Sequence, residues 1–437
     1  MNIKRILWVL LFNLVGFAAQ AQQMYFPPAN NVGAWEQTNP DSLGWCTQNL
    51  DTLYNYLQAT NTKAFLILKD GKIVVERYFG TFRQDSAWQW ASAGKTITAF
   101  CVGLAQQENR LRISDSSSRF LGRGWTSCTP AQERAITIRH QLTMTTGLDD
   151  RVPDDFCTLP SCLRYLAPSN TRWAYHNAPY TMLDGVIEGA SGQTLNQFFT
   201  QRVKNITGMT GLFFRIGYNN IYISTARSMA RFGILMQAGG RWNNTQIMTD
   251  TGYFNSLTRP SNTINKSYGY LWWLNGQESY RVPQSQLEFR GSYAPDAPAD
   301  MVAAIGKDGQ ILSLVPSQKL IVVRMGEDDG TSLVPFTYVN ELWKRVNLVV
   351  CRPTSAKANL KKEVITVKLI NENNQLSGFQ ISSALPYKTT LRNCLGQEIK
   401  LNASRGTFQP IPVLPKGLYT LVVTTDKAQK VQQVLVP

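Results

Sequence analysis

After residue 40, the chain combines one helical pattern of apolar residues with two strand patterns. Apolar residues recur at helical spacing between residues 41 and 60, which predicts an amphipathic helix there. Two short apolar runs follow at residues 64–68 and 73–78, and Asp70-Gly71 between them is a strong hairpin-turn signal. The predicted helical face consists of Leu43, Leu50, Leu53, Tyr54 and Leu57.

The middle of the chain has a mainly helical pattern. Apolar residues after Ser92 recur every three or four positions and predict a helix with one face in a core. Further helices are expected at residues 138–144, 178–188 and 226–238, and Gly192 marks the end of the second of these. The apolar positions of the helix after Ser92 are Ile97, Phe100, Cys101, Leu104 and Ala105.

Strand patterns return late in the chain. Residues 301–305, 311–315 and 320–324 are apolar runs, and a helix pattern at 334–349 follows them. Because strands occur at both ends with helices between them, we expect one α/β domain whose sheet is completed by the late strands. The strands come in hairpins, so this sheet should be mostly antiparallel.

The last part of the chain has a different pattern. Residues 352–362 are polar and indicate a linker. The short alternating strands beyond it predict a small β-sandwich of about 75–80 residues. We therefore divide the chain into a signal at 1–21, an α/β domain at 22–352 and a C-terminal sandwich at 353–437. The strands expected in the sandwich are 364–370, 379–383, 389–392, 418–423 and 431–436.

The first residues have the pattern of a secretory signal. Lys4 and Arg5 precede an apolar run at 6–18, and Ala19-Gln20-Ala21 fits the small-x-small cleavage rule. The run is too short for a membrane span, and no later segment is long and apolar enough for one. We expect an exported protein without an integral membrane segment, located outside the cell, on its surface or in the periplasm.

Charge and cysteines exclude some classes of function. The formal net charge is +15, but the basic residues are scattered and form no stripe with interleaved aromatic residues, which disfavours nucleic-acid binding. Of the seven cysteines, Cys157 and Cys162 are close enough in sequence for a disulfide, whereas Cys101 is expected to be buried in a helix. With no C-x-x-C motif and only two histidines, His140 and His176, a zinc site is disfavoured, and we expect no cofactor.

The strongest candidate for chemistry is the pair Ser92 and Lys95. A serine three residues before a lysine places both side chains on one helix face, with β-carbons about 5–6 Å apart. The serine then lies at a helix N-terminus, where free N–H groups and the dipole favour a developing anion. The lysine can take the proton of the serine, so that no histidine is needed. Lys95 is the single lysine of the chain with a serine three positions earlier.

Two further elements can complete such a site. Tyr175 and Asn177 form a Y-x-N motif that follows a turn and precedes a helix, and a nearby lysine ammonium could lower the pKa of the tyrosine for proton transfer. The Y-x-N motif also begins at three other tyrosines, and we select Tyr175 because it lies between a turn and a helix. Ala304, Gly306 and Lys307 lie at a strand edge, whose N–H groups could form an oxyanion hole. The other Y-x-N tyrosines are Tyr218, Tyr253 and Tyr338.

The three elements in this order resemble the serine β-lactamase and penicillin-binding-protein superfamily, and in particular its class C-like branch. The segments 136–148, 268–273 and 306–310 also resemble that branch, and the likeness runs from about residue 40 to 350. The resemblance implies a β-lactamase/transpeptidase-like fold, with an antiparallel sheet, flanking helices and a helical subdomain. It also implies a serine hydrolase that cleaves an ester, amide or peptide through an acyl-enzyme.

The resemblance further implies the roles of individual residues. Ser92 would be the acylated nucleophile, Lys95 its activating base and Tyr175 the proton carrier to the leaving group. Asn177 would hold the substrate and Lys95, and the N–H groups of Ser92 and Lys307 would form the oxyanion hole. Ala304 stands where β-lactamases usually carry a lysine that anchors the substrate carboxylate. This departure favours an esterase or amidase over a β-lactamase or D-Ala-D-Ala carboxypeptidase.

The C-terminal module resembles a type IX secretion sorting domain. The likeness rests on residues 395–398 and 414–419, Leu-Gly-Gln-Glu and Leu-Pro-Lys-Gly-Leu-Tyr. It implies that secretion machinery is a partner and that the module is removed after export. The alternative is an accessory sandwich that binds glycan or protein.

Other interpretations remain open for the site. Ser92 could be an ordinary helix N-cap with Lys95 solvated, and Tyr175 and Asn177 could be plain loop residues. His176 could serve as a base for a serine, whereas His140 is expected to be structural. The chain contains no G-x-S-x-G, which excludes an α/β-hydrolase elbow. A non-catalytic sensor that is acylated without turnover is the third functional alternative.

Overall fold

The computed structural model describes residues 24–29, 34–327 and 332–351 and most of the C-terminal strands. The predicted signal at 1–21, the linker at 352–362 and the boundary between 352 and 353 all lie outside the described residues. The described C-terminal segments are 366–372, 375–382, 387–393, 397–401, 408–410, 414–415, 417–424 and 429–436.

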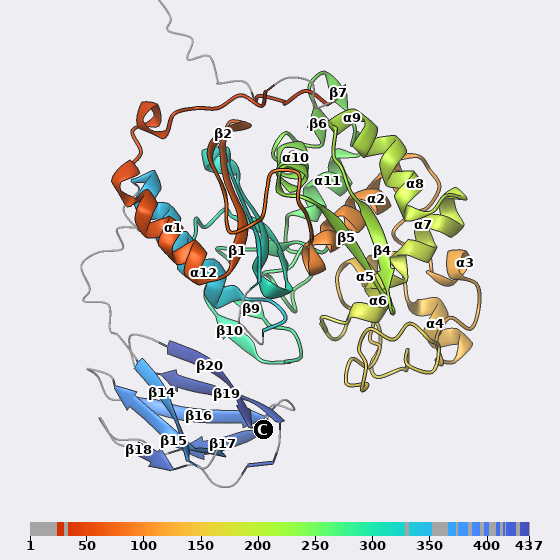
Figure 1. Ribbon diagram of the computed structural model, residues 1–437. Coiled ribbons are helices and arrows are strands. Elements are labelled where there is room, and N and C mark those ends of the chain that lie inside the picture. Colours follow the sequence, from red (N-terminus) through yellow and green to blue (C-terminus); the bar gives the residue numbers. More distant parts are fainter. Residues whose placement is uncertain are drawn as a thin grey trace, which may run out of the picture.

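The largest sheet in the described part of the chain has six antiparallel strands, which come from both ends of the α/β domain (Figure 1). The strand order is β2-β1-β13-β12-β11-β8. Asp70 and Gly71, with φ angles of 52° and 84°, make the predicted hairpin turn between β1 and β2. The strands are β1 (Thr62–Lys69), β2 (Lys72–Tyr78), β8 (Trp273–Leu274), β11 (Val302–Gly306), β12 (Gln310–Val315) and β13 (Leu320–Gly326).

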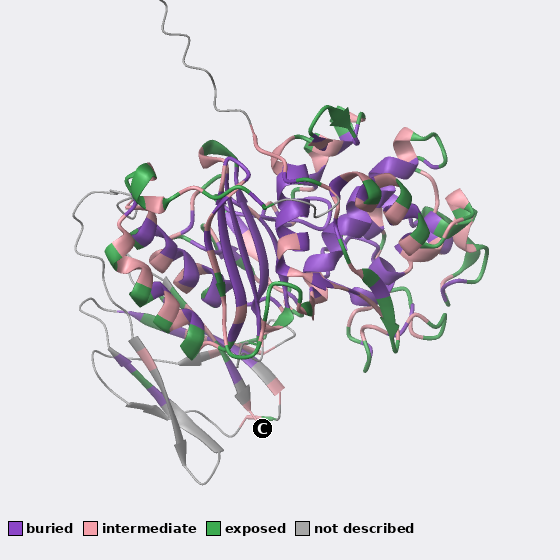
Figure 2. Ribbon diagram, turned by 45° about the horizontal axis from the view of Figure 1, so that its top comes forward, coloured by how far each residue is buried: buried purple, intermediate pink, exposed green. Residues whose placement is uncertain are grey.

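Helices cover both faces of this sheet. On one face α1 (Leu50–Ala59) packs on β1 and on α12 (Phe336–Val350). On the other face α10 (Ala226–Gln237) packs on β1, β12 and β13. The central strands are therefore buried on both sides, as Figure 2 shows. This double burial explains why β12 and β13 are almost continuously apolar rather than alternating.

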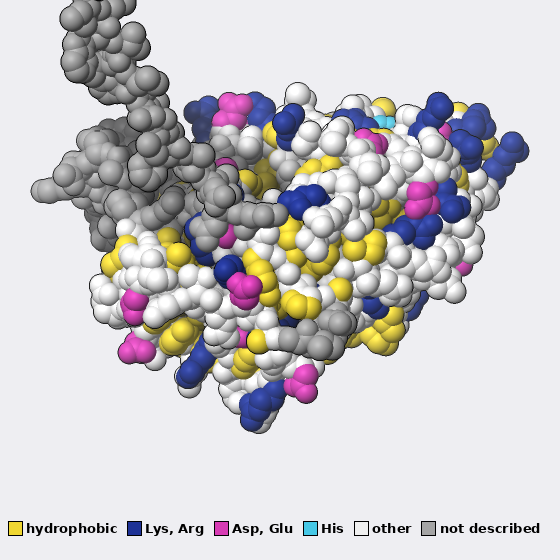
Figure 3. Space-filling model, turned by 90° about the horizontal axis from the view of Figure 1, so that it is seen from above, with side chains coloured by type: hydrophobic (Ala, Val, Ile, Leu, Met, Phe, Trp, Pro, Cys, Tyr) yellow, Lys and Arg dark blue, Asp and Glu magenta, His cyan; other side chains and the backbone are white. Residues whose placement is uncertain are grey.

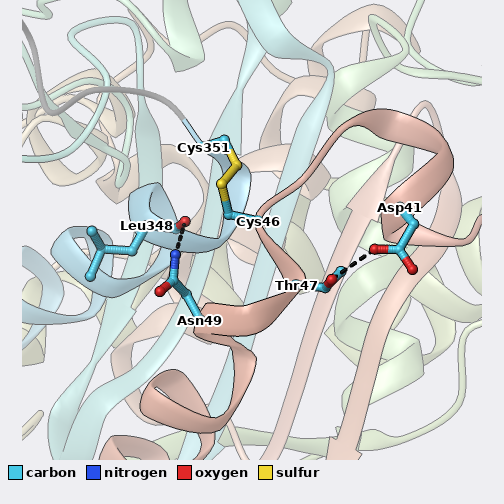
Figure 4. Close-up of a disulfide and its surroundings, with 6 residues drawn as sticks. All are labelled: Asp41, Cys46, Thr47, Asn49, Leu348 and Cys351. Atoms are coloured by element: carbon cyan, nitrogen blue, oxygen red, sulfur yellow. Dashed lines mark hydrogen bonds between the residues drawn. A yellow bond between two sulfur atoms is a disulfide. The ribbon is translucent and has the colours of Figure 1, made fainter.

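A disulfide joins the ends of the α1 and α12 layer (Figure 4). Cys46 precedes α1 and Cys351 follows α12, and their Cα atoms lie 5.3 Å apart although 305 positions separate them in sequence. Beside it, Asn49 donates a hydrogen bond of 2.9 Å to the carbonyl of Leu348. No local pattern in the sequence indicates this pairing, because it depends on packing between the two ends of the domain.

The region between β2 and β8 is mostly helical and carries the Ser92 segment. A 3₁₀ turn, η3 (Ala91–Gly94), leads directly into α2 (Lys95–Gln107). A three-stranded sheet in the order β3-β5-β4 packs against this segment. The further elements are β3 (Ala87–Gln89), α3 (Ser118–Leu121), α4 (Pro130–Ala135), α5 (Ile138–Leu142), α6 (Asn177–Thr181), α7 (Leu183–Ser191), α8 (Leu195–Phe199), η4 (Thr200–Lys204), α9 (Asn205–Thr207), β4 (Leu212–Ile216), β5 (Asn219–Thr225), β6 (Arg241–Trp242), β7 (Thr245–Gln246), α11 (Thr251–Leu257), β9 (Ser279–Arg281) and β10 (Glu288–Arg290).

The C-terminal strands form two small antiparallel sheets, in the orders β14-β15-β18 and β17-β16-β19-β20. Their buried apolar residues form a separate core, which includes Phe379, Leu391 and Leu421. The predicted all-β module is thus present. Its strands are β14 (Thr366–Glu372), β15 (Gln375–Ser382), β16 (Lys388–Asn393), β17 (Glu398–Leu401), β18 (Phe408–Pro410), β19 (Gly417–Thr424) and β20 (Gln429–Val436).

Some predicted boundaries were wrong. The helix predicted at 41–60 begins at Leu50, because the preceding residues form the 3₁₀ turns η1 (Pro40–Leu43) and η2 (Thr47–Asn49). Gly44, with a φ of 68°, ends the first of these turns in the left-handed conformation. The helix predicted at 178–188 is two helices, α6 and α7, and Gly192 caps the second as expected.

Candidate active site

Ser92 and Lys95 lie at the start of α2 and contact each other. Ser92 is in the η3 turn and Lys95 is the first residue of the helix. Lys95 Nζ donates a hydrogen bond of 2.9 Å to Ser92 Oγ. Burial lowers the pKa of Lys95 to about 7, although the carboxylate of Asp155 acts in the opposite direction. A large fraction of this amine is therefore neutral near pH 7, so it can accept the proton of Ser92.

The η3 turn is held in place by β5. The N–H of Trp90 donates to the carbonyl of Tyr222, and the indole N–H of Trp90 donates to Ser224 Oγ at 2.7 Å. A Cβ on Gly94 would lie 3.2 Å from Tyr222 Cβ, so this position has little room for a side chain. Ala91, just before Ser92, has a φ of 45°, which is strained for a residue with a side chain. The nucleophile candidate is thus on a rigid, strained turn.

Tyr175 lies beside Ser92 in an aromatic environment. Its ring stacks on Trp273, with centroids 5.7 Å apart and planes at 18°, and it contacts Tyr268 edge-on. Lys95 Nζ is 5.4 Å from the centroid of the Tyr175 ring. The Ser92 hydroxyl is close enough to the phenol to lower its pKa, but burial has the larger effect and raises it.

This result corrects one expectation from the sequence. A lysine ammonium was expected to lower the pKa of Tyr175, yet that pKa is raised and the pKa of Lys95 is lowered instead. The physical reason is that both groups are buried, and burial disfavours the charged form of each. Near pH 7 Tyr175 is therefore a neutral phenol, and a large fraction of Lys95 is a neutral amine.

Asn177 is the first residue of α6 and is almost fully buried. Its Nδ2 donates a hydrogen bond of 2.9 Å to Oδ2 of Asp155. Its Oδ1 is buried and has no hydrogen-bond partner among the described residues. Burial raises the pKa of Asp155, while the Asn177 amide and Lys95 both act to lower it.

The edge of β11 lies against the Ser92 turn. A Cβ on Gly306 would lie only 2.4 Å from the carbonyl oxygen of Trp90 and 3.1 Å from the backbone nitrogen of Ala93. β8 pairs with β11 only at Val302 and Ala303, so beyond Ala303 it leaves this edge of β11 free. Ala304 is buried in this stretch, and Lys307 follows with an exposed side chain. The predicted strand edge and the predicted nucleophile are thus brought together.

Most of the α/β domain matches a known protein family. A family model described as beta-lactamase matches residues 51–335, well over half of the chain. The chain belongs to the β-lactamase family. The matched segment contains Ser92, Lys95, Tyr175, Asn177 and the β11 edge. No curated protein matches this chain.

Solved structures share the fold of this β-lactamase-family chain. A protein from Bacillus anthracis assigned as a 6-aminohexanoate-dimer hydrolase is 17% identical with a TM-score of 0.53, covering 67% of this chain and 81% of its own. A protein from Bacteroides dorei assigned as a β-lactamase is 16% identical with a TM-score of 0.56, covering 70% and 100%. The octameric penicillin-binding protein homologue from Pyrococcus abyssi is 13% identical with a TM-score of 0.53, covering 89% and 96%. At these identities the likeness shows the fold alone, which is the predicted β-lactamase/transpeptidase-like fold.

In the described part of this β-lactamase-family chain, neither histidine makes a hydrogen bond with Ser92 or Lys95. His140 accepts a hydrogen bond from the N–H of Thr137 and so caps α5, which confirms its predicted structural role. Burial lowers the pKa of His176 to about 4, and neither ring nitrogen has a hydrogen-bond partner among the described residues. His176 thus has no contact that makes it a base for Ser92.

Sequence reasoning missed two side chains next to Lys95. The ring of Tyr180, from α6, has its centroid 4.3 Å from Lys95 Nζ. Asp155, from the loop that precedes α6, is close enough to affect the pKa of Lys95. The loop contains the disulfide between Cys157 and Cys162, the pair that the spacing had suggested. Acidic residues directly before that pair were the available signal.

Other features bear on metals, membranes and charge. Within the described residues, no cluster of three or more His, Cys, Asp or Glu side chains could hold a metal ion. The helices of that part of the chain include none with the length and apolar character of a membrane span. Lys and Arg side chains occur in several separate groups on the face shown in Figure 3, rather than in one continuous stripe.

Proposed function

We propose that this protein is an exported serine hydrolase that cleaves an ester or amide bond through an acyl-enzyme on Ser92. The observation that carries the proposal is the 2.9 Å hydrogen bond between the buried Lys95 Nζ and the half-buried Ser92 Oγ, next to Tyr175. A lysine with a pKa of about 7 can act as the base at neutral pH.

In the proposed reaction, Ser92 Oγ attacks the carbonyl carbon of the substrate while neutral Lys95 takes its proton. The oxyanion is held by the N–H groups of Ser92 and Lys307. The intermediate then collapses with cleavage of the C–O or C–N bond, and Tyr175 gives a proton to the leaving group while it receives one from the Lys95 ammonium. A water molecule attacks the acyl-enzyme by the same route, releases the acid and restores Ser92.

The substrate is proposed to be an ester or amide without a required carboxylate. Ala304 occupies the position where β-lactamases usually have a cationic anchor, and a carboxylate, Asp155, lies close enough to affect Lys95. An anionic group of a β-lactam or of a peptide C-terminus gains little in such a site. D-Ala-D-Ala carboxypeptidase or β-lactamase activity is the alternative outcome of a substrate panel.

The test is hydrolysis of 4-nitrophenyl acetate by the purified α/β domain with its C-terminal module. Ser92→Ala is expected to abolish the enzymatic rate, whereas Ser317→Ala, which changes an exposed serine in the turn after β12, should leave it unchanged. Undiminished hydrolysis by Ser92→Ala would reject the assignment. Stoichiometric labelling by a fluorophosphonate without turnover would instead indicate the non-catalytic sensor.

We further propose that residues 1–21 direct export and that residues 353–437 are a sorting module recognised by secretion machinery. The proposal is supported by the sequence pattern of both segments and by the separate core of the C-terminal strands. N- and C-terminal sequencing of the secreted protein tests it. A chain in the medium that still ends at Pro437 would argue against a removable module.

A further inference from the structure

Asp155 connects a surface loop to the catalytic candidates through two hydrogen bonds. Its carboxylate accepts a hydrogen bond of 2.9 Å from Asn177 Nδ2, and its backbone carbonyl accepts one of 2.9 Å from the N–H of Ala178. Two residues later, the disulfide between Cys157 and Cys162 closes the loop on itself. A short covalent staple thus limits the positions that Asp155 can take relative to the start of α6.

The chemistry of the two side chains fixes the orientation of the Asn177 amide. An ionised carboxylate can only accept hydrogen bonds, so it requires the NH₂ end of Asn177 and not the carbonyl end. The oxygen Oδ1 must then point away from Asp155. In the structure this oxygen is buried and has no hydrogen-bond partner among the described residues. A buried acceptor without a partner destabilises the folded protein, and a ligand that supplies a donor removes that cost.

We propose that Asp155 is a positioning residue that orients the Asn177 amide, so that its oxygen is presented as an acceptor in the active site. The inference rests on the proposed serine hydrolase function of the same site. The acceptor can take an N–H of the substrate or the ammonium that Lys95 becomes after it has deprotonated Ser92. Asp155 acts through Asn177 and is not itself a catalytic residue.

The groups around Asp155 act on its charge in both directions. Burial is the largest effect and raises the pKa of Asp155, and the neighbouring Asp154 and Asp150 act in the same direction, whereas the amide of Asn177 and Lys95 favour the ionised form. The side chain of Asp150 is paired with Arg172 at 2.7 Å. Protonation of Asp155 in acid would remove the requirement for the NH₂ end and let the amide turn over. The orientation of Asn177 should therefore be lost at low pH.

A double-mutant cycle tests the proposal with 4-nitrophenyl acetate and with the matching anilide, which carries an N–H. Asp155→Asn is expected to lower kcat/KM for the anilide at least tenfold. The same change in an Asn177→Ala background should lower it less than twofold, because the residue through which Asp155 acts is gone. Asp154→Asn, which removes the adjacent exposed carboxylate, is the matched control and should stay within twofold of the wild type.

Two results would overturn the proposal. One is a loss in Asp155→Asn that is undiminished in the Asn177→Ala background, which would mean that the two residues act independently. The other is an Asp155→Asn variant that is acylated at the normal rate and then accumulates acyl-enzyme, as shown by mass spectrometry. That result would assign the carboxylate to activation of water rather than to Asn177.

A measurement without turnover separates this proposal from the hydrolase assignment. In protein labelled with ¹⁵N-asparagine, the side-chain NH₂ of Asn177 should exchange slowly with solvent in the wild type. Its exchange should be much faster in Asp155→Asn and unchanged in Asp154→Asn. Unchanged protection in Asp155→Asn would reject the orienting role even if the wild-type protein hydrolyses no substrate tried.

Discussion

The ring of Trp273 lies flat against that of Tyr175, with centroids 5.7 Å apart and an angle of 18° between the planes. Trp273 comes from β8, at the edge of the central sheet, and Tyr175 lies two residues before the start of α6 in the helical region. One stacked pair therefore ties the proposed proton carrier to the sheet that carries the β11 edge. The phenol is held by aromatic packing rather than by a network of charges.

Replacement of Trp273 is expected to affect both stability and catalysis. Trp273→Ala removes a buried indole and should lower the free energy of unfolding by about 3–5 kcal/mol. It should also lower kcat at a temperature where the variant is folded, because Tyr175 loses its support. Trp343→Ala, in α12, is the control, since it removes another buried indole without touching Tyr175. Equal kcat in the two variants would contradict the supporting role of Trp273.

The activity should depend on the protonation of Lys95. Since burial lowers its pKa to about 7, kcat/KM for a neutral ester should rise as pH increases from 6 to 8 and level off above that range. The value of kcat/KM rises with pH, rather than falls, because the neutral amine of Lys95 is the proposed base and its ammonium form is inactive. Lys95→Arg, which stays charged, should lose at least a hundredfold at every pH in this range. A flat profile between pH 6 and 8 would be incompatible with this base.

Gly306 is expected to tolerate no side chain. Gly306→Ala would place a Cβ 2.4 Å from the carbonyl oxygen of Trp90, so β11 and the Ser92 turn must separate. If the β11 edge supplies an oxyanion donor, kcat should fall about 10²–10³-fold. Gly252→Ala in α11 is the control, because the nearest neighbour of its Cβ is a carboxylate oxygen of Asp250 at 3.4 Å, an ordinary van der Waals distance. Steady-state kinetics and thermal unfolding of both variants separate loss of catalysis from loss of fold.

The disulfide between Cys46 and Cys351 should contribute to stability but not to chemistry. It closes a loop of 305 positions and fixes α1 against α12, so Cys46→Ser with Cys351→Ser should lower the free energy of unfolding by about 2–5 kcal/mol. Below the unfolding transition, kcat should remain within twofold of the wild type. Cys157→Ser with Cys162→Ser provides the contrast, since that bridge lies in the loop that carries Asp155. A lower kcat in the variant that lacks Cys46 and Cys351 would contradict this prediction, because it would mean that packing of α1 against α12 affects the active site.

Several elements could be predicted from the sequence because they depend on local interactions. The hairpin at Asp70-Gly71, the apolar strands β12 and β13 and the helix α10 appear where the pattern indicated them. Short or polar elements such as β3 and β17 were missed, because only their pairing with distant strands defines them. At Gly44 the prediction included too much. The helical spacing of apolar residues continues across this position, but its left-handed backbone ends the preceding 3₁₀ turn, so no single helix runs through it.

For the active-site candidates, the local pair could be predicted from the sequence, whereas its surroundings depend on how distant segments pack. Ser92 and Lys95 are three residues apart at the start of a helix, and the geometry of one turn brings such side chains together in any fold. The choice of Tyr175, the approach of Gly306 to the Ser92 turn and the contact of Asp155 with Asn177 each join segments far apart in the chain. The lowered pKa of Lys95 has the same origin, because burial is produced by packing of many residues and by no single one of them.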